Sequence, residues 1–101
     1  MTNKLFVVSY YEGNAVYEPA EGGSYVGESL LRESTVKMKW KHAKREFKRM
    51  VREMSEYLGV KPCFVNARHA YFEYGKHIGE TVDLWIEAEA GQHEERYEGY
   101  C

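Results

Sequence analysis

Three side chains capable of acid–base chemistry alternate along one stretch of the sequence, at positions 69, 71 and 73. If this stretch is a strand, His69, Tyr71 and Glu73 share one face, because successive side chains of a strand point to opposite faces. Together they could perform the acid and base steps that cleave an RNA phosphate. A spacing of two, however, arises by chance on any polar strand. We therefore expect a protein without catalytic residues, and a small ribonuclease is the second alternative, after the binding of nucleic acid.

Residues that bind metals are present, but their spacing does not predict a metal site. Cys63 and Cys101 are the only cysteines, and with the four histidines they form neither a C-x-x-C nor an H-x-x-x-H pair. The glycine-rich residues 21–24 lack the Gly-Lys-Ser/Thr ending of a phosphate-binding loop. We therefore expect no metal and no cofactor.

The distribution of charge gives the strongest functional signal. The net charge is only −2, yet residues 37–52 hold eight of the fourteen Lys and Arg and only one of the sixteen Asp and Glu. If the segment is helical, five of its cations follow one side at steps of three and four, and this stripe could contact the phosphates of DNA or RNA. The five are Lys41, Lys44, Arg45, Lys48 and Arg52. A solvated helix face paired with nearby glutamates explains the same pattern.

The acidic remainder of the chain supports another interpretation, in which the ligand is a protein. Carboxylates near the C-terminus could imitate phosphates and occupy the nucleic-acid groove of a partner. Nine tyrosines are too many for all to be in the core, and Tyr and Trp are typical anchors of interfaces. The residues expected in this interface are Trp85, Glu87, Glu89, Glu94, Glu95, Tyr97 and Tyr100.

Hydrophobic periodicity predicts the elements that position these side chains. Residues 39–58 are the clearest element, an amphipathic helix whose apolar positions recur every three or four residues and which ends at Gly59. Residues 4–11 predict a strand followed by a turn at 12–14, and residues 29–36 predict a second strand, although they would also tolerate helix. Between them, residues 12–27 read as an irregular excursion or small hairpin.

The second half of the chain predicts a β-hairpin of residues 63–74 and 81–90. In its last strand, Val82, Leu84, Ile86 and Ala88 should face the helix, while the opposite face meets water. Residues 91–101 read as a flexible or docked acidic tail. The fold class is therefore α+β, a single domain of residues 1–101 with about four antiparallel strands and one helix on one face, in the order β-β-α-β-β. The water-facing residues of the last strand would be Asp83, Trp85, Glu87 and Glu89.

Several features indicate the compartment. No apolar run approaches the roughly 20 residues that a membrane helix needs, and the first residues lack the layout of a secretory signal. Two cysteines do not make a disulfide framework. We expect a cytoplasmic protein that is not bound to a membrane.

Residues 16–34, VYEPAEGGSYVGESLLRES, are followed by a basic helix, a strand and a short acidic and aromatic end. This pattern resembles small uncharacterised proteins of bacterial phages and mobile elements, a group that includes anti-CRISPR inhibitors. The resemblance implies a compact, charge-polarised, non-catalytic inhibitor that docks on a protein partner, such as a host nuclease or another nucleic-acid-handling complex. Direct binding of DNA or RNA by the helix is the alternative.

Overall fold

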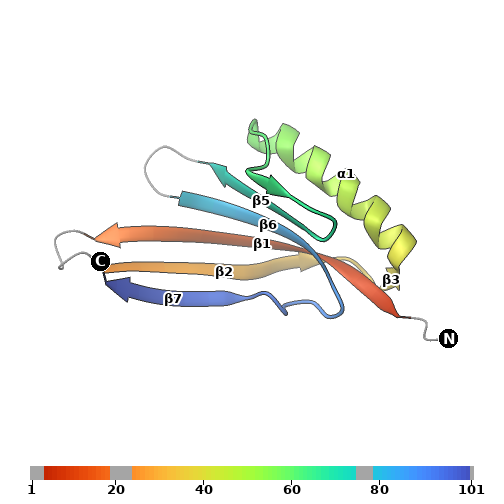
Figure 1. Ribbon diagram of the computed structural model, residues 1–101, viewed down its shortest axis with the longest axis horizontal. Coiled ribbons are helices and arrows are strands. Elements are labelled where there is room, and N and C mark those ends of the chain that lie inside the picture. Colours follow the sequence, from red (N-terminus) through yellow and green to blue (C-terminus); the bar gives the residue numbers. More distant parts are fainter. Residues whose placement is uncertain (1–3, 19–23, 75–78, 101) are drawn as a thin grey trace.

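Strand-forming segments make up most of the chain, and the computed structural model, which describes residues 4–18, 24–74 and 79–100, arranges them in one antiparallel sheet with a helix on one face (Figure 1). The strands lie in the order β4-β5-β6-β1-β2-β7, and the short β3 pairs with the beginning of β1. The α+β class is as predicted, but the expected four strands understate a sheet of seven. The elements are β1 (Leu5–Glu18), β2 (Ser24–Ser34), β3 (Met38–Lys39), α1 (Trp40–Leu58), β4 (Phe64–Val65), β5 (His69–Tyr74), β6 (Gly79–Glu87) and β7 (Glu95–Tyr100).

The helix α1 agrees with its prediction to within one residue. Its apolar side buries Ala43 and Phe47 against the sheet, where α1 packs on β1 and β6. At its end Gly59 adopts a left-handed conformation with φ 71°, and its amide donates to the Ser55 carbonyl at 2.9 Å. Glycine takes this conformation without the penalty that a Cβ atom brings, so the helix stops where the sequence indicates.

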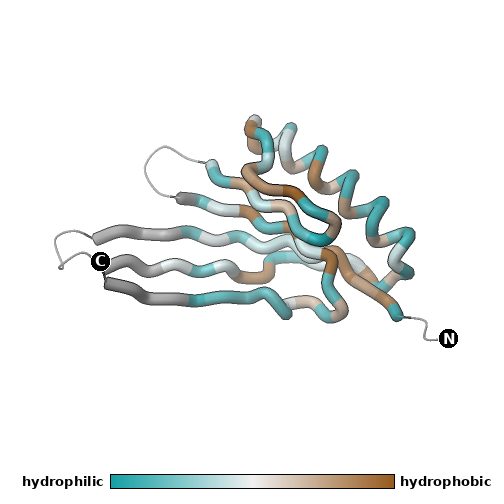
Figure 2. The backbone as a smooth tube through the Cα atoms, in the orientation of Figure 1, coloured by the Kyte–Doolittle hydropathy of each residue, from teal (hydrophilic) through white to brown (hydrophobic). Residues whose placement is uncertain are grey.

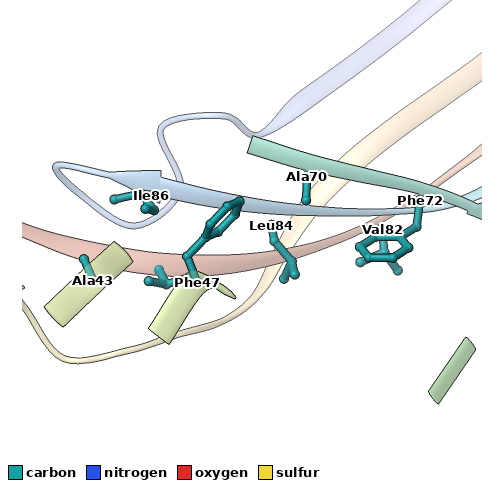
Figure 3. Close-up of a cluster of buried hydrophobic side chains, with 8 residues drawn as sticks. Ala43, Phe47, Ala70, Phe72, Val82, Leu84 and Ile86 are labelled. Carbon is teal, nitrogen blue, oxygen red and sulfur yellow. The ribbon is translucent and has the colours of Figure 1, made fainter. Parts of the chain in front are cut away.

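The hydrophobic core lies between α1 and the strands beneath it. Alternate residues of β6 supply its centre, and Figure 3 shows Phe47 directed at Leu84 and Ile86. The helix-facing side of the last predicted strand is thus confirmed for Val82, Leu84 and Ile86, all of which are buried. It is wrong for Ala88, which is exposed because β6 ends at Glu87 and the chain turns there. The core residues are Val8, Ala43, Phe47, Ala70, Phe72, Val82, Leu84 and Ile86.

The strand β1 is longer than predicted, because residues 12–14 continue it instead of forming a turn. Gly13 lies between β2 and β6, where a Cβ atom would overlap the Glu28 carbonyl oxygen and lie 2.7 Å from Thr81 Oγ1. Glycine here permits the close approach of a neighbouring strand. The excursion expected for residues 12–27 is therefore part of a long β1–β2 hairpin, whose residues 19–23 lie outside the described part of the chain.

The strand predicted for residues 29–36 is confirmed as the second half of β2, which ends at Ser34. Its register with β1 shifts by one residue, because Tyr10 pairs with Glu33 and Tyr11 with Leu31. Arg32 is the extra residue of this β-bulge. Its guanidinium forms an ion pair with the Glu12 carboxylate of β1 at 3.3 Å.

The strand predicted for residues 63–74 is wrong in one respect, since a tight turn divides it into β4 and β5. The Asn66 side-chain oxygen accepts hydrogen bonds from the amides of Arg68 and His69 at 2.9 and 2.8 Å. Asparagine competes in this way with the backbone pairing of a strand. The chain therefore folds back on itself here, and Val65 pairs with Ala70.

Residues 91–101 were not predicted to contain a strand, yet Glu95–Tyr100 forms β7 on the outer edge of β2. A turn precedes it, in which the Glu94 amide donates to the Gly91 carbonyl at 3.2 Å. The tail is thus docked. Figure 1 shows β1, β2 and β7 running on beyond the part of the sheet that α1 covers. Among the residues coloured in Figure 2, hydrophobic ones occur on α1 and on the strands beside it. None of the described helices has the length and apolar character needed to cross a membrane.

Candidate functional site

The cationic stripe predicted on the helix lies on the outer side of α1, away from the sheet. Each of its five residues is exposed, whereas Ala43 and Phe47 on the opposite side are buried. The 3.6-residue period of a helix separates the two sets. The stripe consists of Lys41, Lys44, Arg45, Lys48 and Arg52.

Two carboxylates of α1 are engaged by Arg49, a cation that is not part of the stripe. Arg49 forms ion pairs with Glu46, one turn before it, and with Glu53, one turn after it, the latter at 2.7 Å. The hydrogen bond from Arg49 lowers the pKa of the Glu46 carboxyl, and the hydrogen bonds to Glu46 and Glu53 raise the pKa of Arg49. Within the described residues, none of the five stripe cations forms an ion pair. Their charges therefore remain available to an anionic ligand.

The second predicted surface centres on Trp85, which lies on the face of the sheet opposite α1. Both faces of its indole are covered by imidazoles. His69 stacks on one side, with 3.7 Å between ring centroids and 8° between planes, and His93 on the other, at 3.6 Å and 3°. Trp85 is therefore half-buried between two rings and offers a partner little more than the edge of its indole.

Glu87 was expected to meet water, and this expectation is wrong. Its side chain has no exposed area, because the chain after β6 folds over it. The carboxylate accepts hydrogen bonds from the Tyr11 hydroxyl at 2.6 and 2.8 Å and from the Gly91 amide at 3.0 Å, and it lies 2.6 Å from His93 Nδ1. A buried carboxylate needs such partners, and Glu87 therefore fixes the segment that joins β6 to β7.

The other predicted acidic residues differ in how freely they could meet a partner. Glu89 and Glu95 are exposed. Glu94 is also exposed, but its carboxylate accepts a hydrogen bond from the Leu31 amide at 3.2 Å and so ties the turn to β2. The backbones of Tyr97 and Tyr100 belong to the edge strand β7, while their side chains lie outside the described part of the chain.

The three residues considered for catalysis share one face of β5 but form two separate pairs. His69 Nε2 lies 2.6 Å from Asp83 Oδ1 on the neighbouring strand, and the Tyr71 hydroxyl donates to Glu73 at 2.7 Å. No hydrogen bond among the described residues joins His69 to either. Burial, and then the hydrogen bond to Glu73, raise the pKa of the Tyr71 phenol, so it stays protonated at neutral pH and is not available as a general base.

Sequence reasoning missed the contributions of Asp83 and His93. The alternation of β6 placed Asp83 and Trp85 on one face, so the neighbours of His69 could have been inferred once β5 was paired with β6 in register. His93 follows β6 in an irregular segment and had no such signal. Among the residues that the structure describes, no three His, Cys, Asp or Glu side chains gather as metal ligands.

The sequence matches no protein-family model and no curated protein, and the comparison with solved structures also gives no match.

Proposed function

We propose that this protein binds the phosphate backbone of a nucleic acid through the outer side of α1. The observation that carries the proposal is the state of the five stripe cations: all are exposed, and none is paired with a carboxylate among the described residues. The two α1 carboxylates that form ion pairs, Glu46 and Glu53, are both held by Arg49 and do not neutralise the stripe.

The dimensions of the stripe fit such a ligand. From Lys41 to Arg52 the helix rises about 16 Å at 1.5 Å per residue. Along the axis of duplex DNA the phosphates of one strand follow at about 3.4 Å, so a bound strand presents several of them within reach. Contacts of this kind provide affinity and positioning without reading base sequence.

Adjacent residues of the helix provide a matched test. Lys48 belongs to the stripe, whereas Arg49 carries the same charge one position later and is held by two carboxylates. We expect Lys48→Gln to weaken binding of labelled duplex DNA or single-stranded RNA, measured by fluorescence anisotropy, and to reduce the slope of log affinity against log salt by about 1. Arg49→Gln should leave both quantities nearly unchanged.

The triple variant Lys41→Glu, Lys48→Glu, Arg52→Glu should abolish binding at low salt. Absence of any binding by the unaltered protein at low salt would eliminate the proposal. Equal effects of Lys48→Gln and Arg49→Gln would show a response to net charge alone and would likewise contradict it.

Docking on a host nuclease or another nucleic-acid-handling complex, as an anti-CRISPR inhibitor does, is a second candidate. The favourable observation is that Glu89, Glu94 and Glu95 are exposed close together in sequence, next to the edge strand β7. We expect Glu95→Lys to weaken capture of a partner from host lysate, and capture to survive nuclease treatment of the lysate. Glu56→Lys, at an exposed glutamate on α1, is the control. Capture that depends on nucleic acid would exclude this candidate in favour of the first.

A further inference from the structure

A cavity of about 440 Å³ lies at the end of the sheet where β1 begins and the chain leaves β6. It exists because the two strands stop pairing at Val7 and Glu87. Before that point β1 pairs with β3 instead, and after it the amides of Ala88 and Glu89 turn to the Gln92 side-chain oxygen, at 3.0 and 3.2 Å. The diverging backbones leave a space with an apolar wall.

Two cations line this cavity, although cations are scarce outside the basic segment. Lys4 and Arg68 are two of only six Lys and Arg in the whole chain outside residues 37–52. Both are exposed, and neither forms an ion pair with a described carboxylate. They are separated in sequence by more than sixty residues, so the fold itself brings them together.

Aromatic rings hold the Arg68 guanidinium in place. Its central carbon lies 4.9 Å from the centre of the Trp40 ring and 6.0 Å from that of Phe6. An arginine held by aromatic faces keeps its hydrogen-bond donors free, and its planar fork matches a phosphate or carboxylate. The side chain is therefore positioned for an anion.

The cavity also has one carboxylate, Glu87, but this group is already satisfied. Its side chain is fully buried and receives hydrogen bonds from Tyr11 and Gly91, with His93 Nδ1 also in contact. It does not pair with Lys4 or Arg68. Phe6 and Trp85 supply apolar surface beside the two cations.

We propose that this cavity is a binding site for a small organic anion that combines a flat apolar body with a phosphate or carboxylate group. Arg68 and Lys4 bind the anionic group, and the apolar body lies against Phe6 and the edge of Trp85. The volume falls within the range of small-molecule sites, roughly 300–1,000 Å³, which typically combine apolar walls with a few polar groups. The site is independent of the nucleic-acid surface proposed on α1.

Titration calorimetry with four probes tests the proposal: adenosine monophosphate, adenosine, inorganic phosphate and indole-3-acetate. Binding of adenosine monophosphate but not indole-3-acetate would assign a phosphate ligand, and the reverse a carboxylate ligand. Adenosine and inorganic phosphate should each bind more weakly than the probe that joins both parts. Absence of binding by both adenosine monophosphate and indole-3-acetate would overturn the proposal.

Variants of the two cations locate the binding. Arg68→Gln and Lys4→Gln should each weaken the better probe by about tenfold or more, because each removes a charge-assisted hydrogen bond. Lys61→Gln makes the same change of charge at an exposed lysine that does not line the cavity, and it should have no effect. Circular dichroism verifies that each variant is folded. An equal loss in all three variants would overturn the assigned site.

Discussion

The His93 imidazole lies flat on the Trp85 indole, with 3.6 Å between the ring centroids, and its Nδ1 is 2.6 Å from the Glu87 carboxylate. One side chain thus contacts two residues that share a face of β6. The His93 amide also donates to the Tyr11 hydroxyl at 3.1 Å. These contacts attach the segment between β6 and β7 to the sheet, and they set the position from which β7 pairs with β2.

Replacing His93 should therefore loosen this attachment. We expect His93→Ala to lower the free energy of unfolding by about 1–3 kcal/mol, because the buried Glu87 loses one of its partners. Urea denaturation measures this change. Hydrogen exchange should also show faster exchange of the β7 amides than in the unaltered protein.

The matched control is His42→Ala, which removes an exposed histidine from α1. It should change stability by less than about 0.5 kcal/mol. Equal destabilisation by the two variants, or unchanged exchange in β7, would contradict the attaching role of His93.

The raised pKa of the Tyr11 phenol predicts a loss of stability at alkaline pH. Burial, and then its hydrogen bond to Glu87, raise the pKa of the Tyr11 phenol above the ordinary value of 10.0. The folded state thus keeps the phenol neutral under conditions where the unfolded chain ionises it. This contribution to stability is fully present below the unfolded pKa and is lost as pH rises toward the folded pKa. We expect the free energy of unfolding to fall above about pH 10.

Urea denaturation on both sides of the ordinary tyrosine pKa checks this expectation. Tyr11→Phe should make the alkaline fall less steep by up to about 1.4 kcal/mol per pH unit. It should also lower stability at neutral pH, because Glu87 loses a donor. Tyr57→Phe, at an exposed tyrosine, is the control for the slope. A slope that Tyr11→Phe leaves unaltered would refute the assignment.

The helix and the central strand were predictable because one strong periodicity defines each of them. In α1 the apolar residues and the cations occupy opposite sides, so Phe47 inside and Lys48 outside followed from spacing alone. In β6 the alternation correctly placed Leu84 and Ile86 in the core. For the candidate site, periodicity alone therefore predicted correctly that the cations of the stripe are exposed.

The remaining features depend on contacts that sequence spacing does not reveal. Gly13 reads as a turn, yet it serves close strand packing, and Asn66 interrupts a run that is otherwise typical of a strand. The burial of Glu87 requires Tyr11 and His93, which are 82 positions apart. The pairing of β1 with β6 and the fold of the segment after β6 bring these groups together, so local pattern could not predict that network.

The packing of α1 on the sheet gives a prediction about stability. Phe47 is only 3% exposed and lies in the core, so Phe47→Ala should lower the free energy of unfolding by about 3–5 kcal/mol through lost burial and the cavity that remains. Lys48→Ala, one position later on the outer side, should change it by less than about 0.5 kcal/mol. Urea denaturation compares the two variants. Similar losses would mean that the helix faces the sheet with a different side.

Substitutions of two glycines distinguish the cost of a steric overlap from the cost of a left-handed backbone conformation. Gly59→Ala places a side chain at φ 71° in open space, so only the left-handed conformation is penalised, by about 1–2 kcal/mol. Gly13→Ala has no such conformational penalty, but its Cβ would overlap the Glu28 carbonyl oxygen and crowd Thr81. The overlap involves backbone, so β1 and β2 must move apart for the variant to fold. We expect Gly13→Ala to destabilise the protein more than Gly59→Ala in urea denaturation, and the opposite order would show that β2 does not approach β1 so closely.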